Sequence, residues 1–179
     1  MAAGSTYTPI SSQVLTSDLS SVTFSSIPQT YTDLVLVCSA QCGSGATSTN
    51  GDYRLFLNYN GDAGANYSHT RVYNSNGAMA YQQQTGRSEV DYASHMPAYG
   101  SGEFSTITFN IFNYANSSTY KTTLQKGAVF TNATYTEIGL DVNLWRSTSN
   151  ITTIAITPGG NATTFATKST FSLYGIASA

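Results

Sequence analysis

The residues best suited to acid–base chemistry are the two histidines, His69 in SHT and His95 in SHM. Neither lies in an HExxH zinc motif or in the G-x-S-x-G motif of a nucleophilic serine. A Ser-His-Asp triad assembles only in the fold, and the many serines of this chain offer no preferred partner for either histidine. The sequence therefore predicts a protein that is not an enzyme.

Carboxylate and metal chemistry has equally little support. Glu89 and Asp91, in SEVDY, are the only close acidic pair with strand spacing, and glycosidases need two carboxylates at a defined separation. We interpret them as carboxylates on a solvated strand face. Asn60-Gly61-Asp62 resembles the start of a calcium loop, but the following AGAN lacks the required carboxylates, so we expect a hairpin turn. The sequence predicts neither a metal nor a cofactor.

Cys38 and Cys42 lie in VLVCSAQC. On one strand their Cα atoms would be about 13 Å apart, whereas a disulfide requires about 4.4–6.8 Å. A disulfide would need a sharp turn at Ser39–Gln41, and such a turn is possible because GSG follows. The favoured interpretation is a buried Cys38 and a free Cys42, and two cysteines alone make no metal site.

Trp145, the only tryptophan, is followed directly by Arg146 in DVNLWRS. The pair could be a sugar platform, with the indole stacked on a pyranose ring and the guanidinium alongside. It could equally be structural, at the open end of a sandwich or in a subunit contact, where Trp and Arg are enriched. Apolar residues of the segment from Ile138 to Leu144 occupy even positions, so Trp145 falls on the opposite face or just beyond the strand and is not expected to be another core residue. We favour the structural interpretation.

Composition excludes several classes of partner. Charged residues make up 9% of the 179-residue chain and the net charge is −2, whereas a typical domain has roughly 25% charged residues. With 12% aromatic residues the chain is not disordered. The seven basic residues are scattered, which predicts no nucleic-acid partner.

No apolar run reaches the ~18 residues of a membrane span. The N-terminus lacks signal-peptide features, so we expect synthesis and folding in a cytoplasm.

Alternation of apolar and polar residues with period two dominates the sequence, and turn signals separate the alternating segments. Because no convincing helix is present, the fold class predicted is all-β, an antiparallel β-sandwich of jelly-roll-like type. The predicted core residues are Phe24, Leu34, Leu36, Leu55, Leu57, Ile107, Phe109, Leu140, Val142, Ile154, Ile156 and Leu173.

The domain organisation predicted is a single β-sandwich over residues 13–179. Residues 1–12 form either an N-terminal arm that binds a partner or the domain's own edge strand. The region 61–102 is the least regular, and we expect short edge strands and long loops that make contacts. The candidate contact residues are the tyrosines of this region together with the Trp-Arg pair: Tyr67, Tyr73, Tyr81, Tyr92, Tyr99, Trp145 and Arg146.

Four segments resemble a group of small virion structural proteins of tailed bacteriophages: SSVTFSSIPQTYTDLVLV, NGDAGANYS, IGLDVNLWRSTSNITTIAITP and STFSLYGI. The resemblance covers both ends of the chain and is weakest in 75–102. It implies a homo-oligomeric virion protein, assembled in the host cytoplasm, that contacts the major capsid protein or other virion proteins.

The resemblance leaves two alternative locations in the phage particle. The chain is short, has one domain and lacks a repetitive shaft, which favours a capsid decoration (cement) protein. The alternative is a tail fibre or baseplate module whose aromatic residues recognise a host-surface glycan.

Overall fold

The structure, a computed structural model, describes residues 6–44, 52–91, 94–131 and 135–177. These residues form eleven β-strands and no helix, so none of them lies in a helix that could cross a membrane. In chain order the strands are β1 (Tyr7–Val14), β2 (Val22–Phe24), β3 (Asp33–Ala40), β4 (Tyr53–Tyr59), β5 (Tyr67–Ser75), β6 (Ala78–Arg87), β7 (Ser105–Phe112), β8 (Lys121–Thr131), β9 (Tyr135–Trp145), β10 (Ile154–Gly160) and β11 (Thr170–Ile176).

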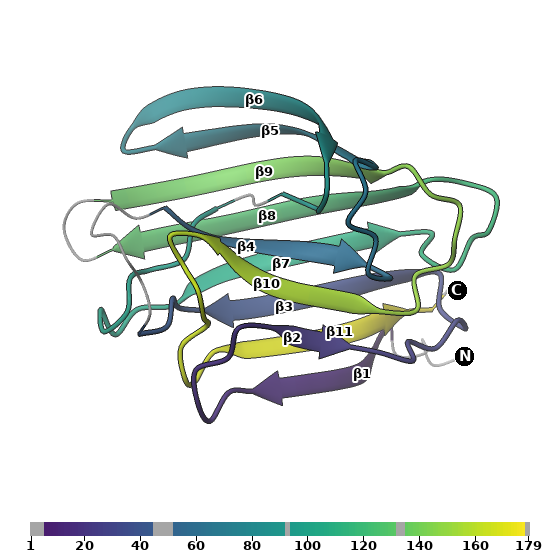
Figure 1. Cartoon of the computed structure of the whole chain (residues 1–179), viewed down its shortest axis with the longest axis horizontal. Coiled ribbons are helices and arrows are strands. Elements are labelled where there is room, and N and C mark those ends of the chain that lie inside the picture. The colour runs from purple at the N-terminus through teal and green to yellow at the C-terminus, as the bar shows by residue number, and fades with distance from the viewer. Residues whose placement is uncertain (1–5, 45–51, 92–93, 132–134, 178–179) are drawn as a thin grey trace.

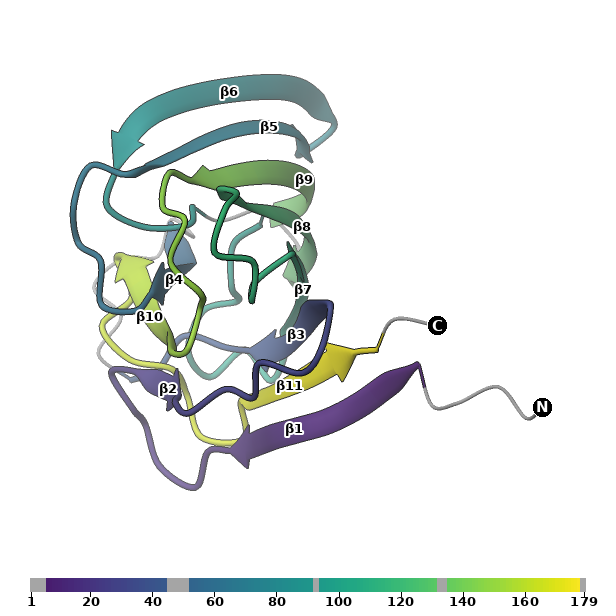
Figure 2. The same cartoon turned by 90° about the vertical axis from the view of Figure 1, so that its right-hand side faces the viewer.

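The strands make two antiparallel sheets that pack as a sandwich. The larger sheet has eight strands in the order β1-β11-β3-β7-β8-β9-β5-β6, and the smaller has the order β2-β10-β4 (Figure 1). Seen from the end, the eight-stranded sheet is a curved layer, and the smaller sheet faces its inner side (Figure 2). The predicted antiparallel β-sandwich is confirmed. The jelly-roll topology is not confirmed by this strand order.

The core lies between the two sheets and follows the predicted alternation. On β7, Ile107, Phe109 and Ile111 point inward and are fully buried. On β3 the even positions are buried, and among the odd positions Val35 is buried as well, which agrees with its apolar residues on both parities. The predicted core is confirmed for Phe24, Leu34, Leu36, Leu55, Leu57, Ile107, Phe109, Ile154, Ile156 and Leu173.

The strand β9 lies with the opposite face inward. Leu140 and Val142 are 45% and 46% exposed, so their prediction as core residues is wrong. Trp145 shares the odd parity of this strand and is only 2% exposed, so the expectation that it is not a core residue is also wrong. Its indole stacks on the ring of Tyr67, with centroids 6.1 Å apart. Burial of these two large aromatic rings fixes the odd face inward.

The region 61–102 is more regular than predicted. Strands β5 and β6 form a long hairpin, whose turn residues Asn76 and Gly77 have positive φ of 50° and 84°. Two positive φ values in a two-residue turn are typical of a type I′ hairpin, for which Asn-Gly is the preferred sequence. The prediction of short edge strands is therefore wrong for 67–87. By contrast, the loop after Asn60 joins β4 to β5, which belong to different sheets, and is not a hairpin.

The segment 88–97, of which the structure describes residues 88–91 and 94–97, covers with these residues the inner face of the sheet beside the narrow three-stranded sheet. The backbone N–H of Asp91 donates to Asn143 Oδ1 on β9 at 3.0 Å. Farther along, Ser94 approaches β8 at Gly127, where a Cβ would lie 2.9 Å from the Ser94 Cβ. A glycine on β8 thus allows this close approach, and the segment completes the second layer over β8 and β9.

The N-terminal strand β1 pairs with β11 from Tyr7 to Val14 at the edge of the eight-stranded sheet. Of the two predicted roles for residues 1–12, the structure therefore shows the edge strand for the part from Tyr7 onward. Residues 1–5 lie outside the described ranges.

Both cysteines are free and buried. Cys42 lies beyond the end of β3, where it forms an isolated β-bridge with Phe165. The favoured interpretation is confirmed, with the addition that Cys42 is as buried as Cys38.

Candidate functional site

The outer face of the larger sheet carries a group of exposed apolar side chains. They lie on the adjacent strands β6, β5, β9 and β8 and are between 45% and 83% exposed. We call this group the outer strip: Val72, Met79, Tyr81, Phe130, Ile138, Leu140 and Val142. Single exposed apolar residues are normal on a protein surface, but a contiguous group of several hundred Å² marks an interaction site.

The outer strip follows from the register of the strands. Tyr81 pairs with Val72, Val72 with Leu140, and Leu140 with Lys126, so one row of neighbouring side chains crosses four strands. The next row along the sheet includes Ile138, which pairs with Asn74 and Ala128. Adjacent rows on one sheet face are in contact range, and the strip is therefore continuous.

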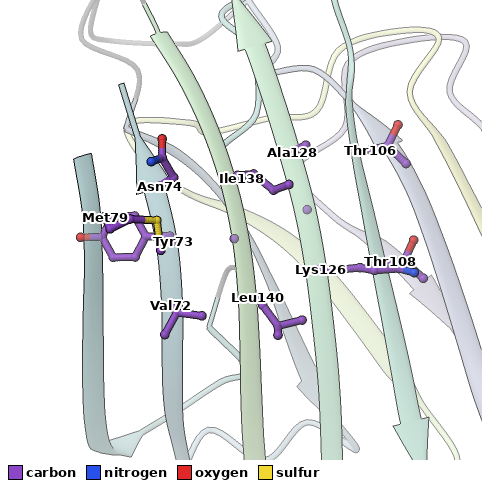
Figure 3. Close-up of a pocket in the computed structure, with 12 residues that line it drawn as sticks. Val72, Tyr73, Asn74, Met79, Thr106, Thr108, Lys126, Ala128, Ile138 and Leu140 are labelled. Atoms are coloured by element: carbon purple, nitrogen blue, oxygen red, sulfur yellow. The ribbon is translucent and has the colours of Figure 1, made fainter. Parts of the chain in front are cut away.

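A shallow hollow of about 520 Å³ lies on this face, and Figure 3 shows the side chains that line it. Its apolar lining comes from neighbouring strands: Val72 on β5, Met79 on β6, and Ile138 and Leu140 on β9. Lys126 on β8 forms part of the rim (Figure 3). It is the only charged side chain (Asp, Glu, Lys or Arg) at the outward positions of the described residues of the adjacent strands β6, β5, β9, β8 and β7. The surface thus suits an uncharged partner.

The inner face of the same strands is charged, which is unusual for a sandwich interior. Together with side chains that pack against it from the start of β4 and from residues 88–91 and 94–97, this face gathers both histidines and five of the nine acidic residues. We call this group the inner cluster: Asp52, Arg54, His69, Arg71, Arg87, Glu89, Asp91, His95, Glu137 and Asp141. The interpretation of Asp91 as a solvated carboxylate is therefore wrong, because its side chain is only 4% exposed.

One half of the inner cluster is centred on His69. The imidazole Nδ1 lies 3.1 Å from Asp91 Oδ2 and 3.9 Å from Asp141 Oδ2. Arg71 pairs with Asp141 across β5 and β9 and stacks over the Tyr73 ring, 4.1 Å from its centroid. Burial raises the pKa of Asp141 from an ordinary 3.8 to about 7; His69 and Arg71 oppose this shift and the Asp91 charge adds to it.

The other half is centred on His95. Its Nδ1 lies 3.0 Å from Glu137 Oε1, and its Nε2 lies 3.3 Å from Asp52 Oδ1. The Tyr135 hydroxyl donates to Glu137 Oε2 at 2.8 Å. Burial alone would raise the pKa of Glu137, but the hydrogen bonds and charge of His95, the Tyr135 bond and the Arg71 charge together hold it below its ordinary value.

A histidine between two carboxylates has the groups of a general base, but a general base must reach a substrate proton. The side chains of His69 and Asp141 are 1% and 0% exposed. Among the described residues no group of three or more His, Cys, Asp or Glu side chains is placed to hold a metal ion. The arrangement therefore suits an internal role, in which paired charges hold the sheet and the segment 88–97 together.

The predicted contact residues do not come together at one site. Tyr67 and Trp145 are interior residues and, with Tyr59, form an aromatic group with ring centroids 5.6–6.2 Å apart. In the folded chain these rings offer no face for a sugar to stack on. Arg146 donates from Nη2 to the backbone oxygen of Ala65 at 2.6 Å.

The remaining tyrosines lie nearer the surface. Tyr81 belongs to the outer strip, Tyr73 lines the hollow, and Tyr99 is exposed in a loop. Tyr92 lies outside the described residues.

Asp62 is a structural residue that the sequence did not reveal. Trp145 Nε1 donates to its Oδ2 at 2.7 Å, and the Gly64 N–H and the Asn66 amide also donate to this carboxylate. Burial alone would raise the pKa of Asp62, but these hydrogen bonds hold it below its ordinary value. Asp62 thus ties the β4–β5 loop to the aromatic group.

Comparisons with known proteins identify no relative. No family model, no curated protein and no solved structure matches the chain. The function is therefore argued from the sequence and from the geometry of this surface.

Proposed function

We propose that the chain is a non-enzymatic structural protein of a tailed-bacteriophage particle, and that it decorates the capsid as a cement protein. The observation that carries the proposal is the outer strip, a broad apolar surface on a rigid sheet. Such a surface serves protein–protein contact, because burial of apolar area drives association without directional chemistry. The sequence resemblance to small virion proteins supports a phage particle as the assembly to which this surface attaches.

The charge distribution agrees with attachment by contact area. Ten of the eighteen charged or histidine side chains of the chain lie in the inner cluster, which leaves eight outside it to form ion pairs with a partner. Long-range steering is weak at a net charge of −2. Attachment should therefore depend on apolar contacts, hydroxyl groups and amides, multiplied by symmetry into avidity.

The alternative location, in a tail module that binds a host glycan, has less support. Aromatic sugar sites present ring faces around a pocket, whereas Trp145 and Tyr67 are buried. Tyr81 and Tyr99 are the candidate rings left with an exposed surface.

Attachment is tested by adding the purified protein to particles that lack it and measuring the amount bound per particle. A matched pair of variants separates the outer strip from general effects of charge. Val72→Glu places a carboxylate in the strip, whereas Val14→Glu places one at an exposed valine on the distant edge strand β1. We expect Val72→Glu to bind at least tenfold more weakly and Val14→Glu to bind as the wild type does.

Two further readouts make this test specific. Raising salt from about 0.1 to 1 M should barely release the bound protein, because apolar contacts are not screened. Release by salt alone, or equal binding of Val72→Glu and wild type, would refute the proposed mode of attachment. Turnover of a polysaccharide, ester or peptide that disappears in His69→Ala or His95→Ala would refute the non-enzymatic role.

A further inference from the structure

The alternation of apolar and polar residues on β9 indicates the kind of surface that packs against the outer strip. On β9, the outward residues Ile138, Leu140 and Val142 are apolar, while inward residues such as Asp141 and Asn143 are polar. This is the pattern of a strand whose outward face packs against another sheet. The second layer within the chain covers the opposite, inner face. The occupant expected on the outer strip is therefore a flat, apolar β-sheet face.

The scarcity of charged side chains on this face indicates which apolar sheet packs against the outer strip. Lys126 is the only charged side chain (Asp, Glu, Lys or Arg) at the outward positions of the described residues of β6, β5, β9, β8 and β7. A partner of ordinary composition, with roughly 25% charged residues, would bury charges against this surface without partners for them, and unpaired buried charges are costly. The same face of a second copy keeps that cost small, because the one charged side chain it brings is its own Lys126.

The area of the surface also fits self-association. The four strands of the outer strip and the neighbouring β7 are spaced about 4.8 Å apart, with four outward residues each at steps of about 6.8 Å, and give a face of about 650 Å² when half a spacing is added around the edge. Two such faces bury about 1,300 Å², within the range of about 1,200–2,000 Å² for specific stable interfaces.

A two-fold contact centred on β9 satisfies these constraints together. With the axis between Leu140 and Val142, β9 of one copy lies over β9 of the other and the apolar residues face each other. Lys126 is on β8, off the axis, so the two ammonium groups do not coincide. The exposed rings of Tyr81 lie near the rim, where they extend the contact.

We infer that two copies of this chain pair face to face through the outer strip, β9 against β9. The inference shares with the proposed function the view that the outer strip is a protein contact, and it names the occupant. On a particle, the dimer would then meet the lattice through other surfaces, and loss of Val72 would weaken binding by removing the second point of attachment.

Sedimentation of the full chain between about 1 and 200 µM tests the inference. We expect the wild type to shift from the mass of one 19.0 kDa chain to twice that mass across this range. Leu140→Glu and Val72→Glu should each weaken the association at least tenfold, and Val14→Glu should leave it unchanged. Leu140→Thr, which removes apolar area without adding charge, should weaken it less, and circular dichroism identifies any variant that fails to fold.

Each outcome decides the inference. A wild type that stays monomeric at 200 µM overturns it, and so does a dimer indifferent to the folded variants Leu140→Thr and Val72→Glu. A monomer that still binds particles through Val72 would show that a virion protein occupies the strip, so the proposed function would stand and the dimer would not. A dimer that loses association in the strip variants but never binds particles would refute the function alone.

Discussion

The buried carboxyl group of Asp141 should make the stability of this protein fall as the pH rises. Its side chain is fully buried in the inner cluster. Burial raises its pKa from 3.8 to about 7, although His69 and Arg71 favour the charged form. The folded protein therefore keeps a proton on Asp141 at pH 5–6, where the unfolded chain has already lost it.

The sign and size of the effect follow from linkage. Below about pH 4 both states carry the proton, and Asp141 adds no pH dependence. Between about pH 4 and 7 the folded state binds one more proton, so the free energy of unfolding falls by about 1.4 kcal/mol per pH unit. Above about pH 7 the folded state also ionises and the loss levels off. Between pH 5 and pH 8 the loss integrates to about 2–3 kcal/mol.

Asp141→Asn removes the titrating group while keeping nearly the same volume. We expect the variant to lose about 2–3 kcal/mol less than the wild type between pH 5 and 8. Urea unfolding at several pH values measures this difference. The fluorescence of Trp145 is a suitable signal, because this single tryptophan is buried against Tyr59 and Tyr67.

Asp18→Asn is the control. Hydrogen bonds from Ser44 hold the pKa of Asp18 below its ordinary value, so its contribution is lost only in acid and the slope between pH 5 and 8 should not change. Parallel curves for wild type and Asp141→Asn over this range would refute the reasoning, since they would mean that the folded state does not retain the proton.

Three further outcomes are expected. Phe109→Ala should cost about 3–5 kcal/mol in urea unfolding, because it leaves a cavity between the sheets, and a cost below about 1 kcal/mol would contradict its place in the core. Trp145→Phe should cost about 1.5–3 kcal/mol, because Asp62 loses the indole N–H, whereas an unchanged midpoint would mean that this bond contributes nothing. Deletion of residues 1–12 removes most of the edge strand β1 and should leave cooperative unfolding intact; loss of the cooperative transition would contradict a sandwich that folds over residues 13–179.

Alternation along the sequence predicted the strands well because most of them have one polar and one apolar face. For β7 the apolar face, with Phe109, is also the inner face. For β9 the same reasoning failed, since period two separates the faces of a strand without saying which one is inside. The inward face of β9 is set by its neighbours, with Trp145 against Tyr67 and Asp141 beside Arg71. Cross-strand partners of this kind are visible only once the register is known.

The two features of the candidate site differ in how far the sequence could have revealed them. The β5–β6 hairpin has a recognisable signal in Asn76-Gly77. Pairing of His69 with Asp91 depends on the return of the segment 88–97 over the sheet, which no local pattern encodes. A weaker signal for the inner cluster was available. His69 and Arg71 share the strand parity of Tyr67 on β5, and Glu137 and Asp141 share that of Trp145 on β9. The outer strip followed only after the face of β9 was known.

The central claim is that the outer strip is a buried protein contact in an assembled phage particle, and an electron cryomicroscopy map of that particle tests it most directly. We predict density for this β-sandwich on the capsid shell, with Val72, Leu140 and Val142 covered by a second copy of the chain. Density on the tail, or a shell-bound sandwich whose outer strip faces solvent, would contradict the account.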